Sequence, residues 1–179
     1  SGGGPVLINL IHDIDLMRFL YGDIASLQAM TSNAIRGHEV EDTAVLMMRF
    51  VNGALGTVTV SDTTVSPWNY DLSARETDRF PQQDINSHFF SGTHGSLTLP
   101  KLEVWSYKDQ RHWEKPISVM RCEPMRASPY EAQLNNFLGV IAGKEKPVCS
   151  ALDGLRALEA ALAVRESAAS GRAVQLTSS

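Results

Sequence analysis

The sequence has few cysteines and no long hydrophobic run. Only Cys122 and Cys149 occur among 179 residues, so we expect no disulfide framework and a reducing, cytoplasmic location. No apolar run approaches the ~18 residues that a membrane span needs. The first residues also lack the basic region and cleavage site of a signal peptide. These absences predict a soluble protein without a membrane partner.

The sequence also has no excess of positive charge. The formal net charge is −4, and no basic stripe interleaved with aromatic residues occurs, so a nucleic-acid partner is not expected. A strand followed by Gly-x-Gly-x-x-Gly and a helix is also absent, and residues 1–179 therefore offer no phosphate site for a dinucleotide. The length and the 43% hydrophobic content predict one well-buried domain over residues 1–179.

The opening segment predicts a helix with a polar face. Pro5 suits a first helical position, the glycines at 2–4 allow a sharp entry, and the helix is expected to run to Tyr21. At about 100° per residue, Asn9, His12 and Asp13 share one side. The opposite side carries the apolar residues Leu7, Leu10, Ile14, Met17 and Tyr21. The polar side is a candidate site, although an ordinary solvated helix face has the same spacing.

A metal site is a further alternative for this helix, because imidazole and carboxylate groups bind zinc or iron. His12, Asp13 and Asp15 supply such groups. Neighbouring helical residues diverge by about 100°, so the three side chains converge poorly on one ion. We therefore expect no metal, and we expect Asp15 to cap or pair within the fold.

Residues 43–62 predict a β-hairpin. Strands 43–51 and 54–62 alternate around Asn52-Gly53, a dipeptide typical of a type I′ turn. Both faces of the first strand are apolar, with only Arg49 breaking one row. An antiparallel sheet normally keeps one face polar. The hairpin therefore predicts helices on one sheet face and a second copy of the chain on the other.

The rest of the chain predicts further strands and two closing helices. Ser128-Pro129 and Ser150-x-x-Asp153 are helix starts, and Gly143 and Gly171 are the expected helix ends. The predicted fold is α+β: an open, mostly antiparallel sheet of five to seven strands with helices packed on one face. The other predicted strands are 24–33, 88–91 paired with 96–99, 102–107 and 111–120, and residues 71–76 and 173–176 are candidates for additional short strands.

Two residues outside the first helix are candidate substrate contacts. Trp68 follows a proline in a loop, where a large aromatic ring either stacks on a sugar or anchors the loop. His88 lies near the Gly92–Gly95 turn and is a weaker candidate. That turn is not expected to bind phosphate, because a strand rather than a helix follows it.

Several segments together resemble one protein family. They are Gly2-Gly3-Gly4-Pro5 through His12-Asp13-Ile14-Asp15-Leu16, Glu41-Asp42-Thr43-Ala44, Phe50-x-Asn52-Gly53-Ala54-Leu55-Gly56, Gly92-Thr93-x-Gly95-Ser96-Leu97, and Asp153-Gly154-Leu155 with Ser167 to Val174. The chain is similar in these segments to the second domain of the glucose-fructose oxidoreductase, inositol dehydrogenase and rhizopine-catabolism (Gfo/Idh/MocA) family. The resemblance implies the fold of the dihydrodipicolinate reductase and glyceraldehyde-3-phosphate dehydrogenase C-terminal domains.

The resemblance also implies a function. Members are NAD(P)-dependent oxidoreductases that act mostly on sugars and cyclic polyols. The chain would then be the substrate-binding and oligomerising half of such an enzyme, inactive alone, with NAD or NADP bound by an N-terminal Rossmann domain that residues 1–179 do not contain. His12 would handle the proton, while Asn9, Asp13, Trp68 and His88 would contact substrate.

One position departs from the family pattern. The family places a carboxylate four residues before the histidine, and Ile8 occupies that position here. Asn9 is the nearest polar substitute, but an amide orients a hydroxyl without taking its proton. Lys115 and Lys146 each stand in a Glu-Lys-Pro tripeptide like the family's catalytic one, yet neither follows a nucleotide-domain strand. A non-catalytic binding module and a metal-dependent hydrolase or isomerase remain the alternatives.

Overall fold

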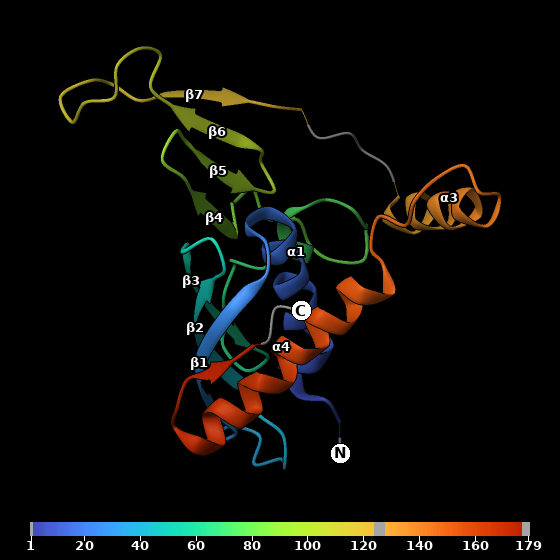
Figure 1. The fold of residues 1–179 in the computed structure, drawn as a ribbon. Coiled ribbons are helices and arrows are strands. Elements are labelled where there is room, and N and C mark those ends of the chain that lie inside the picture. Colours follow the sequence, from blue (N-terminus) through green and yellow to red (C-terminus); the bar gives the residue numbers. More distant parts are fainter. Residues whose placement is uncertain (1, 124–127, 177–179) are drawn as a thin grey trace. The chain divides into compact units, whose positions relative to one another are not determined.

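The computed structural model describes residues 2–123 and 128–176. The chain folds into two compact units, one of residues 1–64 and 148–179 and the other of residues 65–147. Each unit is an α+β assembly with its own antiparallel sheet (Figure 1). The α+β class is confirmed, but the expected sheet of five to seven strands is two sheets of four strands. The prediction of a single domain stays a prediction.

The first unit has a four-stranded sheet in the order β3-β2-β1-β8. The α4 helix packs against β1 and α1 (Figure 1). The predicted N-cap at Ser150 is confirmed, Ser150 and Asp153 form a capping box there, and Gly171 ends the helix in the left-handed conformation at φ 67°. The elements of this unit are η1 (Val6–Leu10), α1 (Ile11–Tyr21), β1 (Ile24–Ser32), β2 (Thr43–Phe50), β3 (Leu55–Ser61), α4 (Ala151–Ser170) and β8 (Val174–Gln175).

The predicted hairpin is formed by β2 and β3, which pair from Thr43 with Ser61 to Arg49 with Leu55. Its turn differs from the type I′ prediction, because Gly53 has a positive φ of 89° and Asn52 does not. The Asn52 amide instead donates to the Tyr21 carbonyl at 2.9 Å, while its oxygen accepts from the Ala54 N–H. The asparagine therefore holds a four-residue connection against the end of α1.

Alternation along β2 creates one buried and one exposed face. The inner face carries Ala44, Leu46, Met48 and Phe50, all almost fully buried. The outer face carries Val45 and Met47, which stay exposed. Directly opposed residues of an antiparallel pair share a face. Met30 of β1, opposite Val45, therefore extends this exposed apolar face.

The second unit has the sheet order β4-β5-β6-β7. The hairpin of β4 and β5 and the strand β6 were predicted. The strand predicted at 111–120 is shorter in the structure, where β7 begins at Ser118. The strand predicted at 71–76 is wrong. The Asn69 side chain accepts from the Leu72 N–H and starts a helical turn there instead. The elements of this unit are α2 (Tyr70–Ser73), β4 (His88–Ser91), β5 (Ser96–Leu99), β6 (Glu103–Ser106), β7 (Ser118–Arg121) and α3 (Pro129–Ile141).

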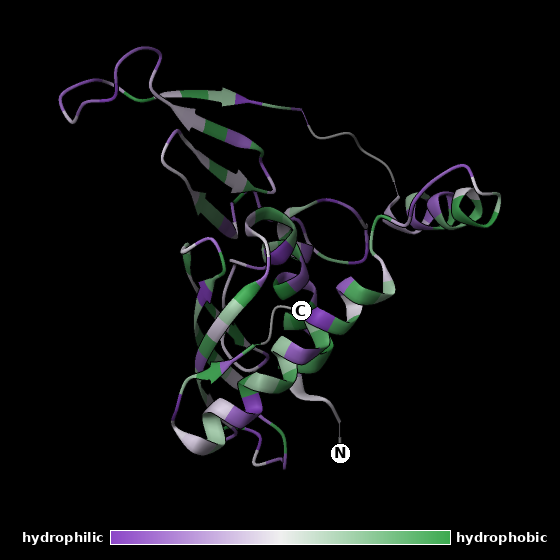
Figure 2. Cartoon of the chain, in the orientation of Figure 1, coloured by the Kyte–Doolittle hydropathy of each residue, from purple (hydrophilic) through white to green (hydrophobic). Residues whose placement is uncertain are grey.

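The two closing helices differ in their packing. The α4 helix buries six residues, while no residue of α3 is buried. Hydrophobic and hydrophilic residues both occur along α3 (Figure 2), and Tyr130, Leu134, Phe137 and Ile141 recur at helical spacing yet stay exposed. The expectation that both closing helices pack on a sheet face is therefore met by α4 alone. Within the described ranges, no helix is long and apolar enough to cross a bilayer.

Arg18 ties α1 to the start of α4. Its guanidinium donates to the Asp153 carbonyl oxygen at 2.9 Å and pairs with Asp23 at 2.7 Å and Asp15 at 3.3 Å. The Arg18 side chain is only 9% exposed, so these partners replace most of its water contacts. Hydrogen bonds from Ser150, with the positive charge of Arg18, lower the pKa of Asp153. The predicted pairing role of Asp15 is confirmed.

We expect Arg18→Ala to lower the free energy of unfolding by about 2–3 kcal/mol. The substitution leaves the Asp153 carbonyl and the carboxylates of Asp15, Asp23 and Asp153 without their shared partner. The partial exposure of these carboxylates keeps the loss below that of a fully buried pair. Chemical denaturation measures this change. Arg36→Ala is the control, because Arg36 is 45% exposed and pairs with one aspartate, Asp62. An exposed pair contributes under about 1 kcal/mol. Equal losses in the two variants would contradict the role of Arg18.

Candidate functional site

The first helix begins with a π-helical segment. The Ile11 N–H donates to the Val6 carbonyl, five residues back, before regular α-helix starts at Ile11. Such segments are rare and occur frequently at functional sites. His12 is the second residue of α1 and therefore lies two positions after the end of this segment. The spacing of about 100° per residue assumed from the sequence does not hold between Asn9 and His12.

The two sides of this helix nevertheless divide as predicted. Asn9 and His12 are exposed, and Asp13 is half-buried. Leu10 and Ile14 are completely buried on the other side. The imidazole of His12 is therefore available to a ligand and takes no part in the core.

A buried carboxylate fixes the beginning of the helix. The Val6 N–H donates to Glu41 Oε1 at 3.1 Å, and the Glu41 side chain is only 6% exposed. Arg165 lies 3.9 Å from Glu41 Oε2 and donates to the Gly3 carbonyl at 2.9 Å. Negative charge at a helix N-terminus is stabilising because the N–H groups there point outward. Glu41 and Arg165 thus set where the helix starts, and with it the position of His12.

Gly4 is required at this entry. Its φ is +68°, a conformation that disfavours residues with a Cβ atom. A Cβ at Gly4 would also collide with the Glu41 carboxylate. The glycine run therefore allows a close approach between backbone and carboxylate.

Asp42, the next residue after Glu41, holds a turn of the same unit. Its Oδ2 accepts from the N–H groups of Ile35 and Arg36, both at 3.0 Å, and its Oδ1 accepts from Thr43 Oγ1 at 2.9 Å. The hydrogen bond from the Arg36 N–H is the main cause that lowers the pKa of Asp42. The Glu41-Asp42 pair is thus a structural support, and neither carboxylate is free for chemistry.

The glycine-rich helix start does not fit a dinucleotide phosphate. Such a site needs free N–H groups at the helix N-terminus. Here the Glu41 carboxylate occupies that end and would repel a phosphate. The Gly92–Gly95 turn leads into β5, a strand. In the part of the chain that the structure describes, these segments offer no cradle for a nicotinamide cofactor's phosphates. Across the same residues, no group of three His, Cys, Asp or Glu side chains is arranged to hold a metal.

Trp68 lies in the loop before α2, in the second unit. Trp68 is 65% exposed, and its backbone N–H donates to Ser66 Oγ at 3.1 Å. An exposed ring in a loop fits a stacking contact better than an anchoring role. Because Trp68 and His12 belong to different units, a shared site that includes both stays a prediction.

His88 lies in β4 and has packing partners. Its ring meets Tyr70 edge-on at 5.8 Å and stacks on Phe90 at 6.0 Å, and its Nδ1 lies 2.9 Å from Ser87 Oγ. Burial and the Glu76 carboxylate, which accepts from the Tyr70 hydroxyl at 2.9 Å, raise the pKa of Tyr70. These contacts give His88 a structural role in holding α2 on the sheet. Its predicted substrate contact stays a prediction.

Two curated relatives align with almost the whole chain. The 1,5-anhydro-D-fructose reductase of Ensifer adhaerens is 27% identical over 98% of this chain and 48% of its own length. The D-apiose dehydrogenase of Rhizobium rhizogenes (strain K84 / ATCC BAA-868) is 25% identical over 93% of this chain and 47% of its own length. The chain therefore spans about half the length of the relatives it matches.

The fold is also that of solved dehydrogenases. The crystal structure of the WlbA dehydrogenase from Chromobacterium violaceum, in complex with NADH and UDP-GlcNAcA, has a TM-score of 0.60 and 25% identity. The similarity covers 98% of this chain and 46% of that one. A family model described as the GFO/IDH/MocA C-terminal domain matches residues 1–98, which include all five predicted site residues. The chain belongs to the Gfo/Idh/MocA family and carries the C-terminal domain of that family.

Proposed function

We propose that the chain is the substrate-binding part of a nicotinamide-dependent oxidoreductase that acts on a sugar or cyclic polyol. His12 handles the proton of the reacting hydroxyl, and Asn9 orients that hydroxyl. The observation that carries the proposal is the exposed imidazole two positions after the end of a π-helical segment whose start Glu41 holds in place. Oxidation of a secondary alcohol needs a group that takes the hydroxyl proton. An imidazole accepts and donates protons near neutral pH.

The substrate class is supported by the relatives. One is a reductase of 1,5-anhydro-D-fructose and another a dehydrogenase of D-apiose. The WlbA dehydrogenase was crystallised with NADH, which supports a nicotinamide cofactor as the hydride carrier. Neither glycine-rich segment forms a cradle for a dinucleotide's phosphates, so we infer that the cofactor is held by a nucleotide-binding domain outside residues 1–179. The 179-residue chain alone is then expected to be inactive.

A substrate screen on the full-length protein tests this function. Sugars and cyclic polyols are incubated with NAD⁺ and with NADP⁺, and absorbance of the reduced nicotinamide is followed. We expect turnover with at least one polyol and one of the two cofactors. Failure of every substrate class in both directions, with a folded protein that binds cofactor, would contradict the enzyme proposal.

A non-catalytic binding module is the second candidate. The supporting observation is Ile8, which is 58% exposed where the family resemblance implies a carboxylate. A module of this kind would bind a sugar through Asn9 and His12 without turnover. The screen above separates the two candidates, because only the enzyme consumes cofactor.

We also propose that the chain self-associates through the outer face of β1, β2 and β3. Exposed apolar side chains line this face, and strand pairing places Met30 opposite Val45 and Met47 opposite Thr57. Patches of this kind on a sheet mark protein–protein contacts. A second copy of the same face is the occupant that the sequence pattern predicts.

Met47→Lys is expected to weaken self-association by about tenfold or more, because it places a charge in an apolar contact. Size-exclusion chromatography with light scattering, run over a dilution series, measures the change. Ile35→Lys is the control, since Ile35 is also exposed but lies outside the sheet. A protein that is already monomeric at micromolar concentration, or an equal effect of the two variants, would refute the interface.

A further inference from the structure

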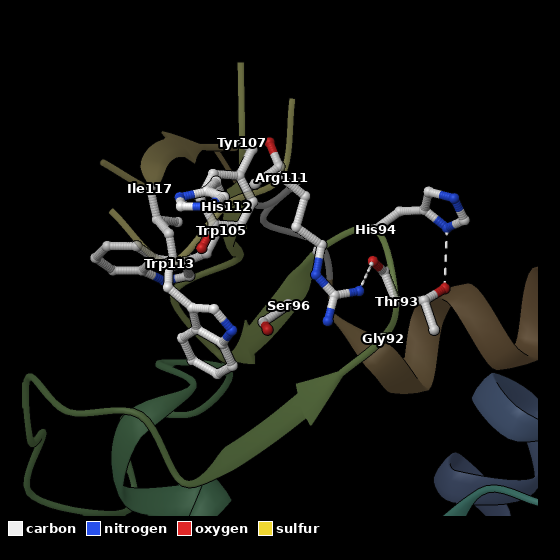
Figure 3. A pocket seen from close by; sticks show the side chains of 12 residues that line it. Gly92, Thr93, His94, Ser96, Trp105, Tyr107, Arg111, His112, Trp113 and Ile117 are labelled. Atoms are coloured by element: carbon white, nitrogen blue, oxygen red, sulfur yellow. Dashed lines mark hydrogen bonds between the residues drawn. The ribbon is translucent and has the colours of Figure 1, made fainter. Parts of the chain in front are cut away.

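The second unit contains a cavity that none of the five candidate site residues lines. Its volume is about 330 Å³, within the range of small-molecule sites. It lies between the Gly92–Gly95 turn and the segment from Trp105 to Ile117 (Figure 3). The cavity therefore uses neither His12 nor the helix that carries it.

Aromatic rings form one part of the cavity wall. Trp105 and Trp113 both line it, together with Ile117 (Figure 3). Trp113 is 95% exposed, so its ring contributes almost nothing to the core of the unit. Indole rings bind flat apolar faces, including the C–H faces of a sugar ring. An almost fully exposed tryptophan beside a cavity is a ready stacking surface.

A guanidinium forms the opposite part of the wall. Arg111 extends toward the glycine turn and donates to the Thr93 carbonyl at 3.2 Å (Figure 3). This bond uses one nitrogen of the fork and leaves other N–H donors free. Among the residues that the structure describes, no carboxylate pairs with Arg111, and none lines the cavity. The Glu114 carboxylate faces His112 instead, at 3.9 Å.

We propose that this cavity binds a ring of monosaccharide size that carries one anionic group, a carboxylate or a phosphate. The ring lies against Trp113 and Trp105, and Arg111 binds the anion. Arginine suits this task because its planar fork matches both carboxylate and phosphate oxygens. The cavity volume fits one such ring better than an extended chain.

Fluorescence titration of the purified chain tests this site. The chain has three tryptophans, so a Trp68→Phe background leaves the two that line the cavity as reporters. The probes are D-glucuronate, D-glucose 6-phosphate and D-glucose. We expect saturable quenching by at least one anion with a Kd below about 10 mM, and about tenfold weaker binding of glucose. The anion that binds more tightly identifies the acidic group.

Variants locate the bound probe. Arg111→Met is expected to remove the preference for the anion, and Trp113→Ala to weaken both anion and glucose binding about fivefold. Lys108→Met is the matched control, because it removes a positive charge from the same segment without lining the cavity. Circular dichroism verifies that each variant folds. His12→Ala should leave the titration unchanged.

Three outcomes would overturn the proposal. They are the absence of saturable binding by either anion, an equal affinity for glucose, and an unaltered preference in Arg111→Met. Loss of binding in His12→Ala would assign the probe to the His12 site instead. None of these outcomes concerns turnover by the full-length protein. The cavity proposal and the proposed oxidoreductase function are therefore tested independently.

Discussion

Replacing His12 with alanine in the full-length protein is expected to lower kcat by about 10²–10⁴-fold. The imidazole is exposed on α1 and contributes nothing to the core, so its loss removes a proton acceptor without loosening the fold. The denaturation midpoint should therefore change little. Steady-state kinetics and chemical denaturation of the same preparation measure both quantities.

The matched control for His12→Ala is His38→Ala. His38 is also an exposed histidine of the first unit and lies outside the candidate site. Its replacement should leave kcat within about twofold of the wild-type value, as for a surface position without a catalytic contact. Asn9→Ala should show an intermediate loss, because an amide orients the hydroxyl but takes no proton. Turnover that His12→Ala leaves intact would remove His12 from the mechanism.

Replacing Gly4 with alanine is expected to lower the free energy of unfolding by about 2–4 kcal/mol. Two effects add: the backbone at φ +68° disfavours any Cβ, and the new methyl group would collide with the Glu41 carboxylate. Glu41 has little room to move, since it accepts from the Val6 N–H and lies beside Arg165. If Glu41 moved away to relieve the collision, the Val6 N–H at the helix N-terminus would lose its hydrogen-bond acceptor.

Gly171→Ala separates the two effects. Gly171 has φ +67° in the same unit, and a Cβ there would meet no atom within 4 Å. It therefore shows the backbone strain alone, about 1–2 kcal/mol. The lower entropy of the unfolded alanine chain is common to both variants and cancels in the comparison. Equal losses in Gly4→Ala and Gly171→Ala would show that contact with Glu41 contributes nothing.

Local patterns in the sequence predicted most of the secondary structure. Alternation predicted β2 and its buried face, and the Ser150-x-x-Asp153 spacing predicted the start of α4. Both features depend on residues a few positions apart. The strand prediction for residues 71–76 was wrong because it used apolar spacing alone. The Asn69 side chain caps a helical turn there, and apolar spacing does not reveal such a cap. The prediction of a type I′ turn was wrong because the Asn52 side chain donates a hydrogen bond to the Tyr21 carbonyl, 31 residues away.

Contacts between residues far apart in the sequence explain why parts of the candidate site could not be predicted from the sequence. Glu41 fixes the helix start from 35 residues away, and no periodic pattern connects it with Val6. The π-helical segment before His12 had no signal in the spacing of the apolar residues. The Trp113 and Arg111 cavity was missed because residues 111–120 were expected to form one strand, whereas β7 begins at Ser118.

A crystal structure of the full-length protein with its nicotinamide cofactor and a substrate alcohol tests the proposed role of His12 most directly. We predict a ring nitrogen of His12 within about 2.6–3.2 Å of the reacting hydroxyl, or connected to it through one water. The nicotinamide should lie on the other side of the same carbon. A substrate bound elsewhere, with the His12 ring pointing into bulk solvent, would contradict the assignment.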